Sequence, residues 1–413
     1  MDLLLADFRA LDLTDETGFL CGRILADLGA EVIKVERPGG DKSRNIGPFY
    51  HDIPDPEKSL YWFAFNTNKK GITLNIESHE GRDILRKLVK KADFVIESFS
   101  VNYLDSLDLG YRELSQINPR LVMTSITPFG QNGPYKDYQA SDLVMMAAGG
   151  YLYLTGDTDR APVGISFPQA NLHGSAQAAV ATLIAHYYRE LTGEGQHVDT
   201  SIQQSFTAGT LSTVAFWELA STILERAGQR RVGSSTGLTS RQTWRCKDGF
   251  VAFFIQGGIH ARFNKALSQW MDSEGMANDF IRGMDWDALD MRTMTKERLS
   301  QIEQPIARFF LTHTKSELYE GGLQRGIDVY PISTVEDIAH NRQLEERGYW
   351  VDIDHDELRV KIRYPGAPAK TTLAHGETSF RAPLIGEYNE EIYIQELGLS
   401  REQLIILKQA NTV

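Results

Sequence analysis

The stretch LADLGAEVIKVERPGG, residues 25–40, decides the fold class. Its first part completes an apolar helical pattern that Gly29 closes. Residues 31–36 (EVIKVE) are a short apolar run between turn residues, which predicts a buried strand. Ligands of open α/β sheets bind beyond the carboxyl ends of such strands. The glycine-rich loop that follows is therefore a candidate phosphate-binding loop, and its basic residues are Arg37, Lys42 and Arg44.

The same alternation of strands and helices continues on both sides of this stretch. A long helix is expected from Asn171 to about Leu191, followed by a returning strand within residues 192–202. Strands that are separated by helices predict a parallel sheet with right-handed crossovers. The other expected strands are 8–14, 71–77, 93–99 and 121–130, and the expected helices between them are 17–30, 79–92 and 111–121.

The composition is that of an ordinary globular protein. The chain has 413 residues, of which 42% are hydrophobic and 24% are charged. At roughly 100–200 residues per domain, this length predicts two domains, or one large domain with an inserted one. The formal net charge is −12. Nucleic-acid binding is therefore disfavoured, because it needs a basic surface.

Cysteine usage and hydropathy predict the compartment. Cys21 and Cys246 are far apart and form neither a metal-binding spacing nor a disulfide framework, which predicts a cytoplasmic protein. The first residues lack a basic segment followed by a long apolar run, so no signal peptide is expected. No apolar run approaches the ~20 residues that a membrane helix needs, so no membrane partner is expected.

Several familiar catalytic motifs do not occur in the sequence: the P-loop, GxSxG, HExxH and paired CxxC. Glu36 ends a strand, as the ribose-binding acid of a dinucleotide fold does, but no GxGxxG precedes it. No metal, nicotinamide or flavin cofactor is therefore expected. Residues 228–240 are rich in glycine and serine, which predicts either a linker or an active-site loop.

Seven separated stretches together carry a family resemblance. They are LADLGAEVIKVERPGGD (25–41), YWFAFNTNKKGITLN (61–75), INPRLVMTSITPFGQNGPY (117–135), RELTGEGQHVDTSI (189–202), CKDGF (246–250), GIDVYPISTVEDI (326–338) and APLIGEYNEE (382–391). In this order they resemble the class III CoA-transferase family, which includes formyl-CoA transferase and carnitine CoA-transferase. The resemblance covers nearly the whole chain, and the ordered set is much more specific than any single motif.

The resemblance implies a fold and an assembly. The expected fold is α/β, with a Rossmann-like large domain built from the N- and C-terminal parts and an inserted small α+β domain. The implied boundaries are 1–225 for the first part of the large CoA-binding domain, 226–327 for the small domain, and 328–413 for the return to the large domain. Two homologous chains are expected to be threaded through each other like linked rings, in an interlocked dimer or a heterotetramer.

The resemblance also implies the contacts of CoA or acyl-CoA, which would be the substrate. Arg37 matches a position near the adenine and phosphates, and Leu74 and Phe99 match the adenine pocket. Asp15 and Glu16 lie in a loop that would line the thiol end, where many members carry small or amide residues. Ser98, which precedes Phe99, stands where the family usually has asparagine. The complete expected set is Asp15, Glu16, Arg37, Arg44, Leu74, Ser98, Phe99 and Gln139.

Asn171 occupies the position of the family's nucleophilic aspartate, in the motif QANLHGS (169–175). That aspartate attacks an acyl-CoA thioester and forms a mixed anhydride and then an aspartyl-CoA thioester. An amide carries no charge and should not sustain this cycle, although asparagine is a good helix N-cap. The small residues that follow would leave room for a thioester against the helix. Asp142 matches another position near the active site and is a possible auxiliary carboxylate.

Four interpretations of Asn171 follow from the resemblance. The chain is a nucleophile-deficient subunit of a heteromeric transferase, similar to those of benzylsuccinate CoA-transferase, or an engineered Asp-to-Asn variant of an active homodimer. Alternatively, it is active through Asp142, Asp15 or Glu16, or it is a non-catalytic CoA-binding or regulatory protein. The racemase branch of the family is disfavoured, because residues 135–142 lack its histidine.

The acyl donor, for example succinyl-CoA, and the acceptor carboxylic acid are not readable from the sequence. The aromatic stretch TWRCKDGFVAFFIQGGIHARF (243–263) either faces a bulky or aromatic acid or forms the core of the small domain.

Overall fold

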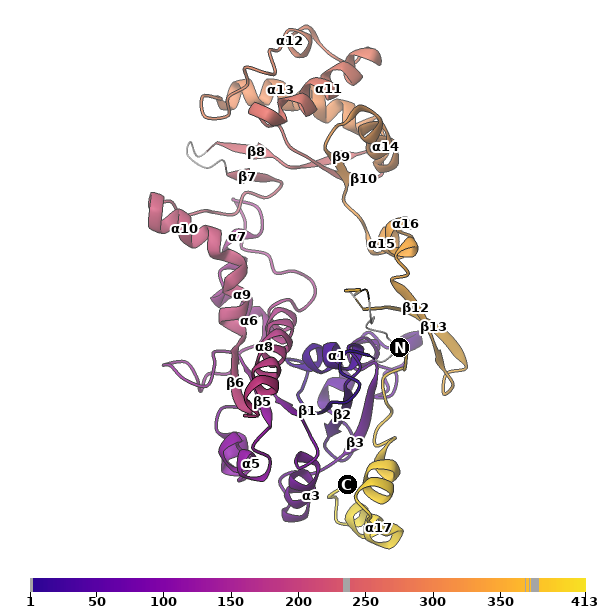
Figure 1. Cartoon of the computed structure of the whole chain (residues 1–413). Helices are drawn as coiled ribbons and strands as arrows, with labels where there is room; N and C mark the ends of the chain where they lie inside the picture. Colours follow the sequence, from indigo (N-terminus) through magenta and orange to yellow (C-terminus); the bar gives the residue numbers. More distant parts are fainter. Residues whose placement is uncertain (1–2, 233–237, 368, 371, 373–378) are drawn as a thin grey trace. The chain divides into compact units, whose positions relative to one another are not determined.

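We describe the chain from a computed structural model, in which residues 3–232, 238–367, 369–370, 372 and 379–413 are placed. The chain divides into two compact units. The first comprises residues 1–149, 165–211 and 342–413, and the second comprises residues 150–164 and 212–341. Figure 1 follows the chain through both.

The first unit is built on a six-stranded sheet. Its strands are β1 (Arg9–Leu13), β2 (Glu31–Glu36), β3 (Lys69–Thr73), β4 (Phe94–Glu97), β5 (Val122–Thr127) and β6 (Gln196–Ser201). All neighbouring pairs are parallel, in the order β3-β2-β1-β4-β5-β6. This is the strand order of doubly wound dinucleotide-binding folds. The predicted α/β fold with a parallel sheet is therefore confirmed, and the interlocked assembly stays a prediction.

Helices cover both faces of this sheet. They are α1 (Phe19–Asp27), α2 (Leu60–Phe65), α3 (His79–Val89), α4 (Tyr103–Ser106), α5 (Tyr111–Ile117), α6 (Asp142–Ala148), α8 (Ala170–Thr192) and α9 (Ile202–Thr207), with short 3-10 turns at Lys42–Asn45, Tyr50–Asp52 and Ala208–Thr210. Alternate strand residues point to opposite faces. Leu11 and Ile33 accordingly pack with the apolar side of α3 on one face. On the other face, the hydroxyl of Thr124 in β5 hydrogen-bonds Thr182 of α8 at 2.7 Å.

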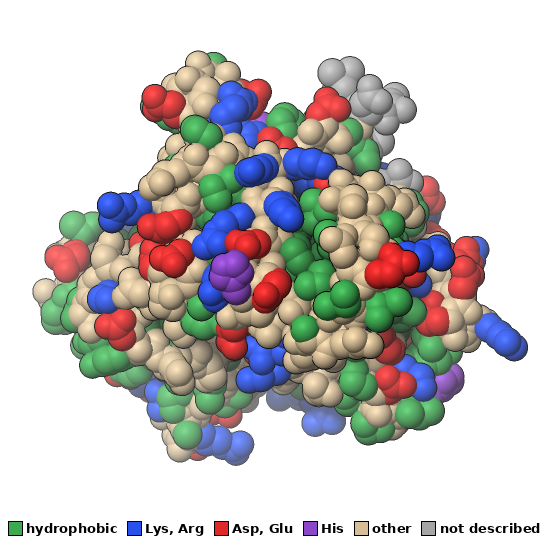
Figure 2. Space-filling model, turned by 90° about the horizontal axis from the view of Figure 1, so that it is seen from below, with side chains coloured by type: hydrophobic (Ala, Val, Ile, Leu, Met, Phe, Trp, Pro, Cys, Tyr) green, Lys and Arg blue, Asp and Glu red, His purple; other side chains and the backbone are tan. Residues whose placement is uncertain are grey.

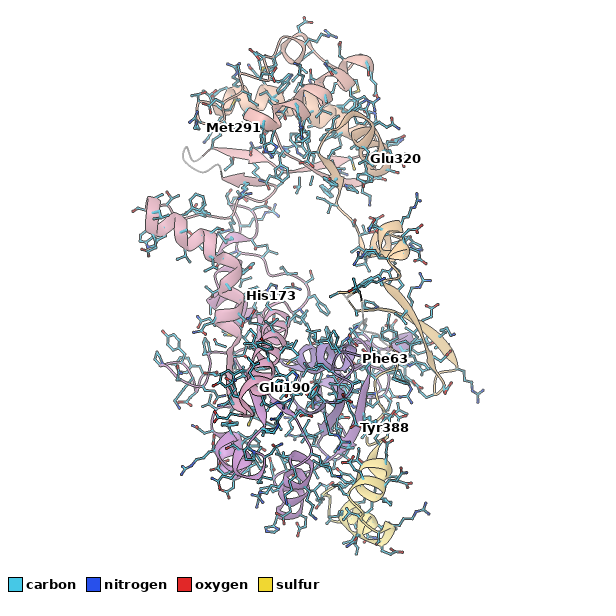
Figure 3. All side chains as sticks on the ribbon, in the orientation of Figure 1. Phe63, His173, Glu190, Met291, Glu320 and Tyr388 are labelled. Carbon is cyan, nitrogen blue, oxygen red and sulfur yellow. The ribbon has the colours of Figure 1, made fainter. Side chains whose placement is uncertain are left out.

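The C-terminal segment returns to the first unit and lies beside its N-terminal strands (Figure 1). A π-helical turn (Glu390–Glu396) and α17 (Arg401–Gln409) pack on the core formed with α3. The Tyr393 hydroxyl donates to the carbonyl of Thr73 at 2.6 Å. The backbone N–H of Tyr388, labelled in Figure 3, donates to the carbonyl of Gly71 at 3.0 Å. The remaining elements of this part are α16 (Arg342–Glu346) and the hairpin of β12 (Trp350–His355) and β13 (Val360–Pro365).

The second unit is a smaller α+β body. Its antiparallel sheet has the order β11-β10-β9 and packs on helices around a core that contains Trp244, Val251 and Phe253. The aromatic stretch at 243–263 thus supplies core residues, the second of its two interpretations. The elements are α7 (Tyr151–Leu154), α10 (Leu211–Ala220), β7 (Arg230–Val232), β8 (Thr239–Arg241), β9 (Thr243–Cys246), β10 (Gly249–Phe253), α11 (Ala261–Ser273), α12 (Asp279–Arg282), α13 (Lys296–Leu311), α14 (Lys315–Arg325), β11 (Val329–Pro331) and α15 (Val335–Ala339), with a 3-10 turn at Gly258–His260.

The second compact unit is larger than the small domain that the sequence suggests at 226–327. The second unit also takes in 150–164, 212–225 and 328–341. Residues 233–237 of the glycine- and serine-rich stretch lie outside the described residues. Within the described part of the chain, no helix is long and apolar enough to cross a membrane. The same residues contain no group of three or more His, Cys, Asp or Glu side chains that could hold a metal ion.

Candidate active site

A cavity of about 520 Å³ opens at the carboxyl ends of β1, β2, β3 and β4. This volume is typical of small-molecule sites. Its place follows from the topology, because the sheet order reverses between β1 and β4 and leaves a crevice there. The structure brings six of the predicted CoA-binding residues to this one lining: Asp15, Glu16, Arg37, Leu74, Ser98 and Phe99.

A buried ionic group supports the loop after β1 that lines the cavity. Asp12 is inaccessible to solvent and accepts hydrogen bonds from the backbone N–H and the hydroxyl of Thr14 at 3.0 and 2.6 Å. The ammonium group of Lys69 lies 2.8 Å from the Asp12 carboxylate. Burial alone would raise the pKa of Asp12, but Lys34 and Lys69 outweigh burial and hold it below its ordinary value. This group fixes the start of the Thr14–Gly18 loop.

In the polar part of the lining, two basic side chains form no ion pair within the described residues, whereas two carboxylates accept hydrogen bonds from hydroxyl groups. Arg37 and Lys42 are exposed and form no ion pair with any described residue. By contrast, Glu16 accepts the hydroxyl of Ser43 at 2.6 Å, and Asp15 accepts the hydroxyl of Ser98 at 2.9 Å. The two cations can therefore meet phosphate groups without breaking an existing ion pair.

Arg44 does not line the cavity, although the sequence suggests it for phosphate binding. It is completely buried, and its guanidinium donates to both carboxylate oxygens of Glu36, at 2.6 and 2.8 Å. It also pairs with Glu57 at 2.8 Å and stacks 3.8 Å from the ring centre of Trp62. Every side of Arg44 is thus engaged within the fold, so we assign it to holding the loop after β2.

The predicted N-cap role of Asn171 is wrong. Helix α8 begins at Ala170, so Asn171 lies in its first turn, and its N-cap residue Gln169 makes no side-chain cap hydrogen bond. The cap is instead the carboxylate of Asp142, the first residue of α6. It accepts the backbone N–H groups of Gln169 and Asn171 at 3.1 and 2.9 Å. The carboxylate satisfies two donors that the helix leaves unpaired, and its charge is stabilised at the helix N-terminus.

The described lining of the cavity includes no residue of α8, but a hydrogen bond connects this helix to the loop that lines the cavity. The hydroxyl of Ser175 donates to the carbonyl of Thr17 at 2.6 Å, which joins α8 to the loop of Asp15 and Glu16. Tyr61 is affected by charges from the loop after β1 and from α6. Burial raises the pKa of its phenol most, and the carboxylates of Glu16, Asp142 and Asp15 raise it further. Asn171 itself is 7% exposed, and its side-chain amide hydrogen-bonds to none of the described residues.

Gln139 and His173 lie outside this arrangement. Gln139 is exposed in the loop between β5 and α6 and does not line the cavity. His173, labelled near the start of α8 in Figure 3, is exposed and packs edge-on against Phe206 at 5.2 Å. The small residues of α8 allow close packing rather than leaving space, because a Cβ on Gly174 would come within 2.7 Å of Ile202.

Sequence reasoning missed a second group of polar residues. A cavity of about 350 Å³ is lined by Glu97, Ser125 and His197, among others. Each of these residues comes from a different strand, so no local sequence motif contains all three of them. The signal lies in the strand register, since Glu97 of β4 pairs with Ser125 of β5 and Met123 of β5 pairs with His197 of β6.

Comparison with known proteins gives this geometry a family context. The sequence matches the family described as CoA-transferase family III over residues 5–389. It is 35% identical to the succinyl-CoA:(R)-benzylsuccinate CoA-transferase subunit BbsE of Thauera aromatica, over 94% of this chain and 93% of that protein. It is 30% identical to the succinyl-CoA:mesaconate CoA-transferase of Haloarcula hispanica, over 96% of each chain. A CAIB/BAIF family protein from Brucella suis has a similar crystal structure, with a TM-score of 0.80 and 26% identity over 96% of this chain and 100% of that one.

Proposed function

The chain belongs to CoA-transferase family III, and on that premise we propose that it is a nucleophile-deficient subunit of a heteromeric CoA-transferase. The enzyme would move CoA between an acyl-CoA, such as succinyl-CoA, and a carboxylic acid, in the cytoplasm. The single observation that carries this proposal is Asn171 in the first turn of α8, a helix that Ser175 joins to the loop of Asp15 and Glu16 in the lining of a cavity with two available cations.

The cavity suits CoA in size and in chemistry. Its apolar wall includes Leu74 and the ring of Phe99, which packs 4.8 Å from Tyr103 and offers a surface for a planar base. Arg37 and Lys42 would hold the phosphates, since neither forms an ion pair with a described residue. The thiol end would then point toward the loop of Asp15 and Glu16, which Ser175 joins to α8.

The residues around Asn171 support the loss of the covalent step. An amide oxygen is a poor nucleophile and cannot form the anhydride that the family's chemistry requires. Asp142 is an unsuitable substitute, because both of its oxygens accept backbone N–H groups of α8. Asp15 accepts hydrogen bonds from Thr17 and Ser98 through one of its oxygens, Oδ1. We therefore assign catalysis to a homologous partner chain that carries aspartate at the matching position.

An exposed apolar stripe on α8 favours a protein partner. Its members recur at helical spacing, and three of them are about two-thirds exposed: Ile184 at 64%, Tyr187 at 67% and Leu191 at 68%. Contiguous exposed apolar surface of this kind marks interfaces. Because homologous chains form interlocked pairs in the resembled family, we take the occupant to be such a chain, in a dimer or a heterotetramer. The stripe consists of Val180, Ile184, Tyr187, Tyr188 and Leu191.

The relatives suggest the substrate class. BbsE is named as a subunit of an enzyme that uses succinyl-CoA and (R)-benzylsuccinate, and a second relative is named for succinyl-CoA and mesaconate. We propose succinyl-CoA as donor and a substituted dicarboxylic acid, including aromatic ones, as acceptor. A non-catalytic CoA-binding or regulatory role is the second candidate, which the amide at position 171 also favours.

The test of this proposal is CoA binding by the purified chain and pairing with the partner. Isothermal titration with CoA should give one site per chain, and Arg37→Ala should weaken binding about tenfold, as expected for loss of one phosphate contact. Lys58→Ala, a surface change at the Asp55 pair, serves as the matched control. Native mass spectrometry should show the mixed assembly when the aspartate-bearing homologue is added. Absence of CoA binding would contradict the proposal, and homodimers alone would contradict its heteromeric part.

A further inference from the structure

Glu97 is the last residue of β4 and lines the second cavity. It directly precedes Ser98 and Phe99, which line the cavity of about 520 Å³, here called the CoA cavity. The residue is 4% exposed, and its Oε2 atom accepts the backbone N–H of Phe99 at 2.7 Å. That bond fixes the backbone of Ser98 and Phe99, which line the CoA cavity. The hydroxyl of Ser98 continues the contact to Asp15 at 2.9 Å. Glu97 therefore supports the wall on which the inner loop of the cavity rests.

A hydrogen-bonded row connects Glu97 to the second cavity. Its carboxyl hydrogen-bonds the side chain of Ser125, and the Ser125 hydroxyl lies 2.8 Å from Nε2 of His197. The imidazole stacks on the ring of Tyr111, with centroids 5.5 Å apart. His197 is itself exposed. The row thus runs from solvent, through one imidazole and one hydroxyl, to a buried carboxyl.

The charges that face this row are mostly negative. Asp15 approaches Glu97 from the loop after β1, and Asp105 approaches it from α4. Burial raises the pKa of Glu97 to about 7, with help from these two carboxylates and against the hydrogen bonds from Ser125 and Phe99. Partial burial lowers the pKa of His197, against the opposing effect of Asp199 and Asp105, so the imidazole is neutral at pH 7. Arg112 is the one basic side chain of the described lining of the second cavity, and it is exposed.

We propose that Glu97 is a proton-binding positioning residue of the CoA cavity, which takes up a proton through His197 and Ser125 when an anionic ligand binds. This inference rests on the proposed binding of CoA. A solvent proton enters at Nδ1 of His197, the Nε2 proton passes to Ser125, and the Ser125 proton passes to the Glu97 carboxylate. One proton is gained in total, and His197 ends neutral with its proton on the other nitrogen. The driving force is the added negative charge of a ligand in the cavity whose wall Glu97 supports.

The test is the number of protons taken up when CoA binds. Titration calorimetry at pH 7, in two buffers of different ionisation enthalpy, should show that the wild-type chain takes up a measurable fraction of a proton more than Glu97→Gln. Between pH 6 and pH 8, the dissociation constant of CoA should rise about three- to tenfold more in the wild type than in Glu97→Gln. The reason is that CoA binding raises the pKa of the Glu97 carboxyl, whereas glutamine does not titrate. The phosphates of CoA titrate equally in both proteins and cancel in this difference.

Two further variants keep the test sharp. Glu80→Gln removes an exposed carboxylate of α3 that lines neither cavity and should behave as wild type. Ser125→Ala keeps the carboxyl of Glu97 but removes a hydrogen bond that favours its charge, so the pH of maximal uptake should move upward. Equal proton uptake by the wild type and Glu97→Gln, with CoA bound by both, would overturn the inference alone. Failure of the wild type to bind CoA at any pH would overturn the proposed function and the inference together.

Discussion

Replacing Asp142 by asparagine should loosen the first turn of α8 without altering its contacts with the sheet. The carboxylate accepts two N–H groups, of Gln169 and Asn171. An asparagine side chain has one acceptor oxygen, and its NH₂ group would face the second N–H. Loss of a helix cap costs about 1 kcal/mol, and loss of the charge at the helix N-terminus costs about 0.3–1 kcal/mol more. Unpairing a buried N–H adds to this, so we expect a total of about 2 kcal/mol.

Hydrogen exchange followed by mass spectrometry measures this loss locally, at the amides of the first turn of α8. A loss of about 2 kcal/mol corresponds to about 30-fold faster exchange for the amides of residues 169–173. Asn171→Ala is the matched control, since Asn171 contributes only its backbone N–H to the cap. Exchange in Asp142→Asn that stays within about threefold of wild type would refute the capping assignment, as would an equal acceleration in Asn171→Ala.

Three further predictions follow from buried charges and from position 171. Arg44→Met should cost at least about 3 kcal/mol, because it leaves Glu36 buried without its partner, and thermal denaturation should register this as a clear fall in Tm, whereas Lys58→Met should change little. Relative to the wild type, Glu97→Gln should gain about 3 kcal/mol of stability as the pH rises from about 4.5 to 7. The pKa of Glu97 is raised in the folded state, so the stability that its protonated carboxyl contributes to the wild type is complete at low pH and is lost as the carboxyl ionises. Urea denaturation at pH 5 and pH 8 checks this, and a constant difference between the two proteins would contradict it. Asn171→Asp should leave the lone chain without substantial CoA transfer; a gain of several orders of magnitude would instead support an engineered variant of an active homodimer.

The fold could be predicted because its signals are local. The apolar run EVIKVE, closed on one side by Gly29 and on the other by a glycine-rich loop, has the length and the composition of a buried parallel strand, and β2 spans those residues, Glu31–Glu36. The carboxyl ends of parallel strands then place Asp15, Arg37, Leu74 and Phe99 at one edge of the sheet. Topology alone indicates the loop of Arg37, whereas the family resemblance suggested Asp15, Leu74 and Phe99.

The parts that the sequence did not reveal depend on partners far along the chain. Arg44 has the residue type and loop context of a phosphate ligand, but Glu36 and Trp62 enclose it. Asn171 has the residue type of a cap, but a carboxylate 29 residues earlier in the chain takes that role. Glu97 and its row also have no sequence signature, because β4, β5 and β6 contribute one residue each. In each case packing decides the role of a residue that is chemically suited to another.

Surface charge gave a limited expectation, which stays a prediction. The net charge of −12 argues against a nucleic-acid partner. On the face that Figure 2 displays, Lys and Arg side chains are interspersed with Asp and Glu. Net charge says nothing, however, about a local site for an anion. Arg37 and Lys42 lie in the lining of the cavity, where the neighbouring carboxylates Glu16 and Asp41 are engaged by Ser43.

The central claim is that this chain binds CoA but depends on a homologous partner for chemistry. The most direct measurement is the transfer of CoA from succinyl-CoA to (R)-benzylsuccinate, followed by chromatography of the acyl-CoA products. It should be made for the purified chain, for the aspartate-bearing homologue, and for the two together. We predict no turnover by the chain alone and turnover at an ordinary enzymatic rate by the mixed assembly. Turnover of about 1 s⁻¹ or more by the chain alone would contradict the account.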